Sequence, residues 1–143
     1  MIRIGMIGSI GSGKTFIARL FNYPVFNADI QVNKIYKSDK KCFYNLKKKL
    51  PKFIKSFPII KKELIEAIKE NKKNLNIISS VVHPIVRKKL NDFIKKNKKS
   101  KIIVLDVPLL IENKLNNKND ILIFVESSKI KILARLKKRS NYN

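Results

Sequence analysis

Gly8-Ser-Ile-Gly-Ser-Gly-Lys-Thr15 is the stretch that decides the fold of this chain of 143 residues. It fits the pattern G-x-x-x-x-G-K-[ST] of a phosphate-binding loop. The apolar run before it, residues 2–7, indicates a buried parallel strand, and the amphipathic pattern after it indicates a helix. Glycine permits the positive φ angles and the close approach of backbone to phosphate that such a loop needs. The sequence therefore predicts a strand, a loop and a helix whose backbone N–H groups surround a phosphate.

The lysine and the threonine that end this loop predict its ligands. In enzymes with such a loop the lysine bridges the β- and γ-phosphates of a nucleotide, and the hydroxyl group holds Mg²⁺. We therefore expect ATP and Mg²⁺ as cofactors, with Lys14 taking part in the reaction and Thr15 binding the metal. The residues expected to hold the nucleotide are Gly8, Ser9, Ile10, Gly11, Ser12, Gly13, Lys14 and Thr15.

The rest of the chain predicts strands that alternate with helices. Short apolar runs indicate three further strands, at residues 24–26, 101–105 and 121–125. Residues 30–99 follow a helical pattern, and Ser127 or Ser128 is placed to cap a last helix. Breaks in the helical pattern are expected near Pro51, Pro58 and Pro84. This alternation predicts an α/β fold, a parallel sheet with helices on both faces, in a single domain.

A net charge of +23 is typical of proteins that bind nucleic acids, because clustered lysine and arginine attract polyanions. Here, however, lysine outnumbers arginine by 28 to 5, and the lysines are spread along most of the chain at positions typical of solvated helix faces. The sequence contains no recognisable nucleic-acid-binding module. We therefore expect no specific nucleic-acid partner, while a basic, non-catalytic nucleotide- or nucleic-acid-binding remnant stays open as an alternative.

The sequence gives only weak indications of a membrane-spanning segment or of export. The longest apolar run, residues 102–111, is interrupted by Asp106 and Pro108 and is too short to span a bilayer. The chain starts without a signal-peptide pattern. The single cysteine, Cys42, cannot form an internal disulfide and is more typical of a small buried hydrophobic residue than of a nucleophile. These features predict a cytoplasmic protein without a membrane partner.

Five stretches, taken in order, resemble the dephospho-CoA kinase family. They are residues 7–21, which contain the loop; Val25-Phe-Asn-Ala-Asp29; His83-Pro84 with Arg87; Val104-Leu-Asp-Val-Pro-Leu-Leu-Ile-Glu112; and residues 132–139. The resemblance implies a P-loop kinase fold and a transferase that moves the γ-phosphoryl group of ATP to the ribose 3′-hydroxyl of dephospho-CoA, giving coenzyme A and ADP. It also implies an acceptor-binding helical insertion at about residues 30–100 and the start of a lid at about residues 135–143. Another small-molecule P-loop kinase, with a nucleoside monophosphate or a sugar acid as acceptor, stays open as an alternative.

Asp29 is the candidate for the group that contacts the acceptor. It follows a short predicted strand, so we expect it at the carboxyl edge of the sheet, where ligands bind in open α/β folds. The resemblance makes it the residue that touches the 3′-hydroxyl. A carboxylate with a pKa of about 4 is a weak base for an alcohol, so orienting the hydroxyl matters more than removing its proton. The alternative is a cap of the helix that follows. The family's first aspartate in this motif is Asn27 here.

Two arginines near the end of the sequence are candidates for phosphate contacts. Arg135 and Arg139 lie four residues apart, which places both guanidinium groups on one helical face. Guanidinium binds phosphate bidentately and stays charged. By resemblance, Arg139 stabilises charge on the transferring phosphoryl group and Arg135 belongs to the nucleotide site. Solvated surface charge is the alternative for both.

The remaining candidates concern the metal and the acceptor. Asp106 ends a predicted strand and can hold Mg²⁺ through water, or it can cap the turn before Pro108. The resemblance places four residues at the acceptor, namely Asp29, His83, Arg87 and Pro108. His83 also has a structural interpretation, because a His-Pro pair at a helix break is commonly structural.

The last prediction concerns the edge of the sheet. By resemblance, related kinases continue through the rest of the lid, a further strand and a closing helix. Without those elements we expect the strand at residues 121–125, or a neighbour, to lack a partner. An unpaired apolar edge favours association. We therefore expect these 143 residues to self-associate through an exposed sheet edge and to have low kinase activity.

Overall fold

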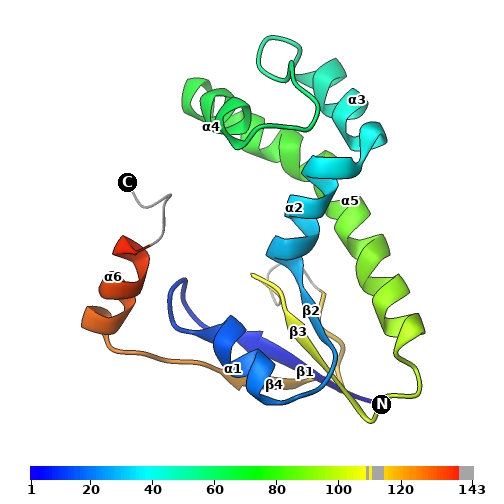
Figure 1. Ribbon diagram of the computed structural model, residues 1–143, viewed down its shortest axis with the longest axis vertical. Helices are drawn as coiled ribbons and strands as arrows, with labels where there is room; N and C mark the ends of the chain where they lie inside the picture. The colour runs from blue at the N-terminus through cyan, green and yellow to red at the C-terminus, as the bar shows by residue number, and fades with distance from the viewer. Residues whose placement is uncertain (109, 111–114, 139–143) are drawn as a thin grey trace. The chain divides into compact units, whose positions relative to one another are not determined.

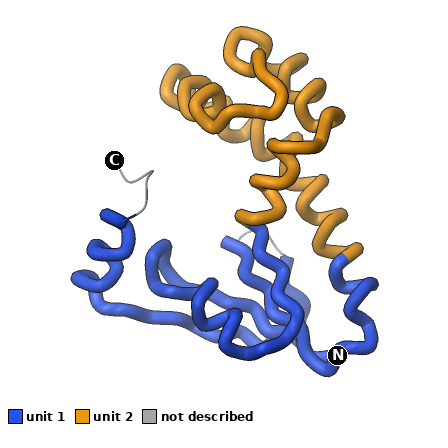
Figure 2. Tube along the Cα trace, in the orientation of Figure 1, with its two compact units in different colours: residues 1–28, 93–143 blue, residues 29–92 orange. Residues whose placement is uncertain are grey.

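The structure is a computed structural model that describes residues 1–108, 110 and 115–138. It divides into two compact units (Figure 2). Residues 1–28 and 93–143 form unit 1, and residues 29–92 form unit 2. Unit 1 contains the glycine-rich loop and all of the described strands, whereas unit 2 is helical and overlaps the segment expected to be a helical insertion.

The described part of unit 1 is built on a parallel sheet of four strands. They are β1 (Ile2–Ile7), β2 (Val25–Asn27), β3 (Ile102–Asp106) and β4 (Ile121–Phe124), arranged in the order β2-β3-β1-β4 (Figure 1). Nearly continuous apolar runs suit these strands because both faces of a parallel sheet are usually covered. The predicted parallel α/β fold is confirmed, and β1 has the predicted bounds.

Helices contact both faces of this sheet. Successive side chains of a strand point to opposite faces, so the partners of each side chain show which face a helix covers. On one face, Ile4 and Val104 form a buried cluster with Ala18 of α1 (Lys14–Leu20). On the other face, the ring of Phe26 packs 5.5 Å from the ring of Phe93, centroid to centroid. Phe93 lies near the end of α5 (Lys73–Lys96), in the part of that helix that belongs to unit 1.

The strand β4 forms one edge of the described sheet, since β1 is the one strand with which it pairs there. The side chains of Ile121 and Phe124 are 52% and 65% exposed. As expected, this strand therefore lies at a sheet edge with exposed apolar side chains. It leads to α6 (Lys129–Lys137), whose cap is Ser128, with the side-chain oxygen accepting a hydrogen bond from the N–H of Lys131 at 3.4 Å.

Unit 2 consists of α3 (Lys40–Lys49), α4 (Lys61–Glu70) and most of α2 (Ala28–Ser38) and α5. The carboxylate of Asp39 accepts a hydrogen bond from the N–H of Cys42 at 2.8 Å. This N-cap separates α2 from α3, because it satisfies a backbone donor that a helix start leaves unpaired. Pro51 and Pro58 both lie between α3 and α4, so the breaks predicted near these prolines are confirmed.

The break predicted near Pro84 is wrong, because α5 continues through this residue. Proline has no N–H group, so the carbonyl of Ser80 lacks the donor that it would meet in a regular helix. Buried apolar residues on both sides of Pro84 outweigh this loss. They recur every four residues, at Ile78, Val82, Val86 and Leu90, and give the whole helix one continuous packed stripe.

Candidate active site

The glycine-rich loop between β1 and α1 has the backbone conformation that its sequence pattern predicts. Gly8, Gly11 and Gly13 have φ angles of 136°, 83° and 104°, in a region that disfavours any side chain. A Cβ atom on Gly8 would also lie 2.3 Å from the carbonyl oxygen of Val125. Both the backbone conformation and the available space therefore require glycine at position 8.

Lys14 is the first residue of α1, and its side chain folds back over the loop. Its Nζ atom donates hydrogen bonds to the carbonyl oxygens of Gly8 at 2.7 Å and Ser9 at 2.8 Å. These partners hold the ammonium group beside the loop without neutralising its charge, because carbonyl groups carry only partial charges. A phosphate group can therefore replace them with charge-assisted hydrogen bonds, which are stronger.

Asp106 connects three elements at the carboxyl edge of the sheet. Its Oδ2 atom accepts hydrogen bonds from the hydroxyl of Thr15 and from the side-chain amide of Asn27, both at 2.6 Å. Asp106 ends β3 and Asn27 ends the neighbouring β2, where the two residues pair in register. Only 4% of Asp106 is exposed. Because the Thr15 hydroxyl donates its hydrogen bond to Asp106, the lone pairs of the Thr15 oxygen stay available for a cation.

Asn27 is a member of this site that sequence reasoning missed. The sequence marks Asn27 only as a departure from the family motif, whereas the structure brings its amide to the one described carboxylate that also contacts the loop threonine. The position of Asn27 at the end of a predicted strand could have marked it as a candidate site residue. Its contact with Asp106 could not be predicted, because the sequence does not specify that β2 and β3 are neighbours.

Arg135, a residue of α6, also contacts the loop. Its Nη1 atom donates hydrogen bonds to the carbonyl oxygens of Gly11 at 3.1 Å and Ser12 at 2.9 Å, and to the hydroxyl of Ser127 at 3.3 Å. Ser12 itself is 4% exposed, and its hydroxyl has no hydrogen-bond partner within the described residues. The structure therefore brings Arg135 to the predicted nucleotide site. Arg139 lies outside the described residues.

Asp29 is an exposed residue in the first turn of α2. The helix begins at Ala28, so Asp29 is its second residue and does not precede it. The alternative that Asp29 is the cap of this helix is therefore wrong. A carboxylate in a first helical turn still interacts favourably with the helix dipole.

The predicted acceptor residues fall into both units. His83 and Arg87 lie one turn apart on α5, are exposed, and line a hollow of about 330 Å³ in unit 2. The other residues that line it are Asn76, Ser79, Ser80 and Pro84. Pro108 belongs to unit 1, where it is exposed shortly after the end of β3. The structure thus brings His83 and Arg87 together, as their spacing on a helix predicts.

Comparison with known proteins identifies the family. A family model described as dephospho-CoA kinase matches residues 2–143. The chain belongs to the dephospho-CoA kinase family. A dephospho-CoA kinase of Wolbachia sp. subsp. Brugia malayi is 34% identical over 142 residues, which cover 96% of this chain and 73% of that protein.

Two further dephospho-CoA kinases illustrate the range of similarity. The protein of Wolbachia pipientis wMel is 34% identical over 142 residues, covering 96% of this chain and 73% of the relative. The protein of Bartonella henselae is 31% identical over 129 residues, covering 87% of this chain and 66% of the relative. Among solved structures, the crystal structure of TT1252 from Thermus thermophilus superposes with a TM-score of 0.79 at 26% identity, covering 99% of this chain and 74% of that one.

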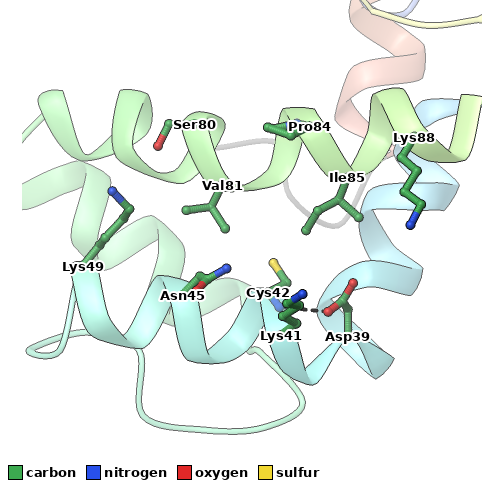
Figure 3. Close-up of a pocket in the computed structure, with 10 residues that line it drawn as sticks. All are labelled: Asp39, Lys41, Cys42, Asn45, Lys49, Ser80, Val81, Pro84, Ile85 and Lys88. Atoms are coloured by element: carbon green, nitrogen blue, oxygen red, sulfur yellow. Dashed lines mark hydrogen bonds between the residues drawn. The ribbon is translucent and has the colours of Figure 1, made fainter.

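A second hollow lies in unit 2, between α3 and α5. It measures about 610 Å³. Figure 3 shows Val81 and Ile85 of α5 pointing toward α3, and Cys42 and Asn45 of α3 pointing toward α5. Asp39, Lys41, Lys49, Ser80, Pro84 and Lys88 complete the lining. The three lysines and the single carboxylate make this hollow electropositive.

Cys42 is a buried residue, as predicted. Its side chain is 0% exposed, and burial, with a smaller contribution from the charge of Asp39, raises the pKa of the Cys42 thiol to about 11. The thiolate form needed for nucleophilic attack is therefore rare near neutral pH.

No helix in the described part of the chain is both long and apolar enough to cross a membrane.

Proposed function

We propose that this chain transfers the γ-phosphoryl group of ATP to the ribose 3′-hydroxyl of dephospho-CoA, and that its predicted site residues carry the reaction. The observation that carries the proposal is the loop of residues 8–15 with Lys14, Thr15 and Asp106 arranged around it, in a chain that matches the dephospho-CoA kinase model along its length. Phosphoryl transfer needs little covalent chemistry from the protein, so positioning and electrostatic stabilisation are the two tasks of the site.

The loop and Lys14 perform the first task. Backbone N–H groups of the loop and of the first turn of α1 surround the phosphates, as the positive end of a helix favours. Lys14 leaves the carbonyl groups of Gly8 and Ser9 for phosphate oxygens. This exchange adds a full positive charge where negative charge develops during transfer.

The donor set at Thr15 and Asp106 fits Mg²⁺. In nucleotide sites this ion is commonly held by one or two protein oxygens together with phosphate oxygens and water. Thr15 would ligate it through the hydroxyl oxygen, and Asp106 would act on it through water. When bound, Mg²⁺ neutralises charge on the phosphates. Asn27 and Thr15 both donate to Asp106 and so keep that carboxylate in one orientation.

Replacing Asp106 with asparagine tests this assignment. The variant keeps an acceptor oxygen for Thr15 and Asn27 but loses the negative charge. We expect the Mg²⁺ concentration for half-maximal activity and for tight nucleotide binding to rise about 10- to 100-fold. Titrations with Mg²⁺, followed by ADP production and by a fluorescent ATP analogue, measure both. Asp92→Asn, at an exposed position of α5, is the matched control. An unchanged Mg²⁺ dependence would return Asp106 to the role of a turn cap.

The acceptor side of the proposal rests on Asp29, His83, Arg87 and Pro108. Asp29 orients the 3′-hydroxyl through a hydrogen bond, since a carboxylate is too weak a base to deprotonate an alcohol beforehand. His83 and Arg87 offer donors for the acceptor's anionic groups. Arg139 stabilises charge on the transferring group, and Arg135 belongs to the nucleotide site. We assign the reaction to the cytoplasm, with no membrane or specific nucleic-acid partner, because ATP and free thiols such as Cys42 are normal there.

A coupled assay of ADP production tests the proposed reaction. Purified protein with ATP and Mg²⁺ is offered dephospho-CoA, a nucleoside monophosphate, shikimate or gluconate in separate reactions. ADP is expected with dephospho-CoA and not with the others. ADP production with one of the other acceptors, and none with dephospho-CoA, identifies a different P-loop kinase. Steeply salt-dependent binding of RNA or DNA without stabilisation by nucleotide would instead support a basic binding protein.

We further propose that the chain self-associates through the edge of β4. Exposed apolar residues Ile121 and Phe124 favour this contact, as does the edge of β4 that is unpaired among the described strands. Gel filtration at increasing protein concentration is expected to give a rising apparent mass. Ile121→Lys, which adds a charge to the edge, is expected to restore a monomer. A monomer at every concentration in the unaltered chain would contradict this proposal.

A further inference from the structure

The helix α6 packs directly against the phosphate-binding loop. A Cβ atom on Gly11 would lie 3.2 Å from the side chains of both Ile132 and Leu136. Arg135, between these two residues in sequence, donates to the carbonyl groups of Gly11 and Ser12 at 3.1 and 2.9 Å. Gly11 therefore serves two purposes, because its lack of a side chain both permits the φ angle of 83° and leaves room for α6.

The hydrogen bonds of Arg135 fix the orientation of two successive peptide groups. A trans peptide is planar, so the N–H of one residue points opposite to the carbonyl of the residue before it. With both carbonyls held by the guanidinium group, the N–H groups of Ser12 and Gly13 point away from Arg135. The N–H of Ser12 donates to the carbonyl of Ser9 at 3.2 Å, which keeps the loop closed on itself. We expect the N–H of Gly13 to donate to an incoming phosphate.

We propose that Arg135 is a positioning residue that organises the phosphate-binding loop before the nucleotide arrives. Its bonds keep the carbonyl dipoles of Gly11 and Ser12 turned toward a positive charge, where they cannot repel a phosphate. A preorganised loop spends less of the binding free energy on ordering its own backbone. This role goes beyond the proposed function, and it rests on that function only in taking the loop as the nucleotide site.

This role differs from a direct contact with the nucleotide in what it predicts for the empty loop. A residue that only touches the ligand leaves the empty loop unaffected when it is replaced, whereas a positioning residue stabilises the loop without ligand. The guanidinium group of Arg135 contacts the loop through the backbone carbonyl groups of Gly11 and Ser12. The rate of amide hydrogen exchange in the empty protein therefore separates the two roles.

The experiment uses the chain of 143 residues and compares Arg135→Met, Arg135→Lys and the control Lys137→Met. Lys137 is exposed on the same helix and lies two residues away, on a different helical face. Hydrogen exchange of residues 8–15 is measured without nucleotide, and the affinity for a fluorescent ATP analogue is measured separately. The coupled assay then gives kcat and KM for ATP.

Faster exchange across residues 8–15 is expected in Arg135→Met, with nucleotide affinity about 10- to 100-fold lower, as for the loss of a charge-assisted hydrogen bond. Arg135→Lys should be intermediate in both measurements, because an ammonium group can still donate to a carbonyl. Lys137→Met should match the unaltered protein. The loss is expected mainly in KM, since the bonds act before chemistry.

Normal exchange in empty Arg135→Met, combined with weaker nucleotide binding, would overturn the proposal in favour of direct ligand contact. If Arg135→Met does not fold, Arg135→Lys decides between intermediate exchange, which supports positioning, and unaltered exchange, which contradicts it. If the unaltered chain binds no ATP analogue, the proposed function fails, while the exchange rates of the empty loop still test the role of Arg135.

Discussion

Replacing Lys14 with alanine is expected to lower kcat/KM for ATP about 100- to 1,000-fold, whichever acceptor is supplied. The ammonium group is a positive charge that the structure holds at the start of the loop, through its bonds to the carbonyls of Gly8 and Ser9. Removing one preorganised electrostatic donor at a site of developing charge typically has an effect of this size. The coupled assay and the affinity for a fluorescent ATP analogue measure the loss.

A lysine elsewhere in the chain provides the control for this experiment. Lys48→Ala removes the same charge from an exposed position of α3 and is expected to leave both measurements unchanged. The comparison matters because a net charge of +23 attracts anions to the whole surface. Equal losses in the two variants would mean that Lys14 contributes only to this general attraction.

Replacing Asp29 with asparagine is expected to reduce turnover about 100-fold or more, as for other positioned acid or base groups, while ATP binding stays nearly intact. Asparagine has almost the same size as aspartate but lacks the negative charge that accepts a strong hydrogen bond from a hydroxyl group. Because Asp29 is exposed in the first turn of α2, we expect no large loss of stability from the change. Thermal unfolding checks this point directly.

The split between turnover and ATP binding is the decisive result for Asp29. Single-turnover measurements with saturating ATP and dephospho-CoA isolate the transfer step. Asp92→Asn again serves as the exposed control. Normal turnover in Asp29→Asn would remove Asp29 from the acceptor site and leave it as a charge that stabilises the start of α2.

The features that could be predicted from the sequence are those encoded by nearby residues. The strand β1 and the loop after it depend on an apolar run and on glycine spacing, and both were predicted correctly. The breaks at Pro51 and Pro58 follow from the missing N–H of proline in the same way. Pro84 also lacks an N–H group, yet α5 continues through it because buried residues pack on both sides of it.

The contacts of the candidate site depended on residues far apart in the sequence. Asp106 meets Thr15 and Asn27 because β3 lies between β2 and β1, and no local pattern specifies this order of strands. The contact between Arg135 and the loop depends likewise on how α6 packs on Gly11. Sequence spacing suggested which residues to consider, whereas their partners depended on the tertiary structure.

The position of β1 within the sheet has a consequence for how the chain folds during synthesis. This strand leaves the ribosome before the other three described strands, yet Ile4 pairs with Val104 on one side and Ile121 on the other. The helices of unit 2 find their packing partners within residues 29–92 and can fold as soon as that segment has emerged. The central strand must wait, with its apolar side chains unpaired, until translation has passed β4. A ribosome that pauses between β3 and β4 therefore carries a folded helical unit and an incomplete sheet, which is the stage at which a chaperone is most needed.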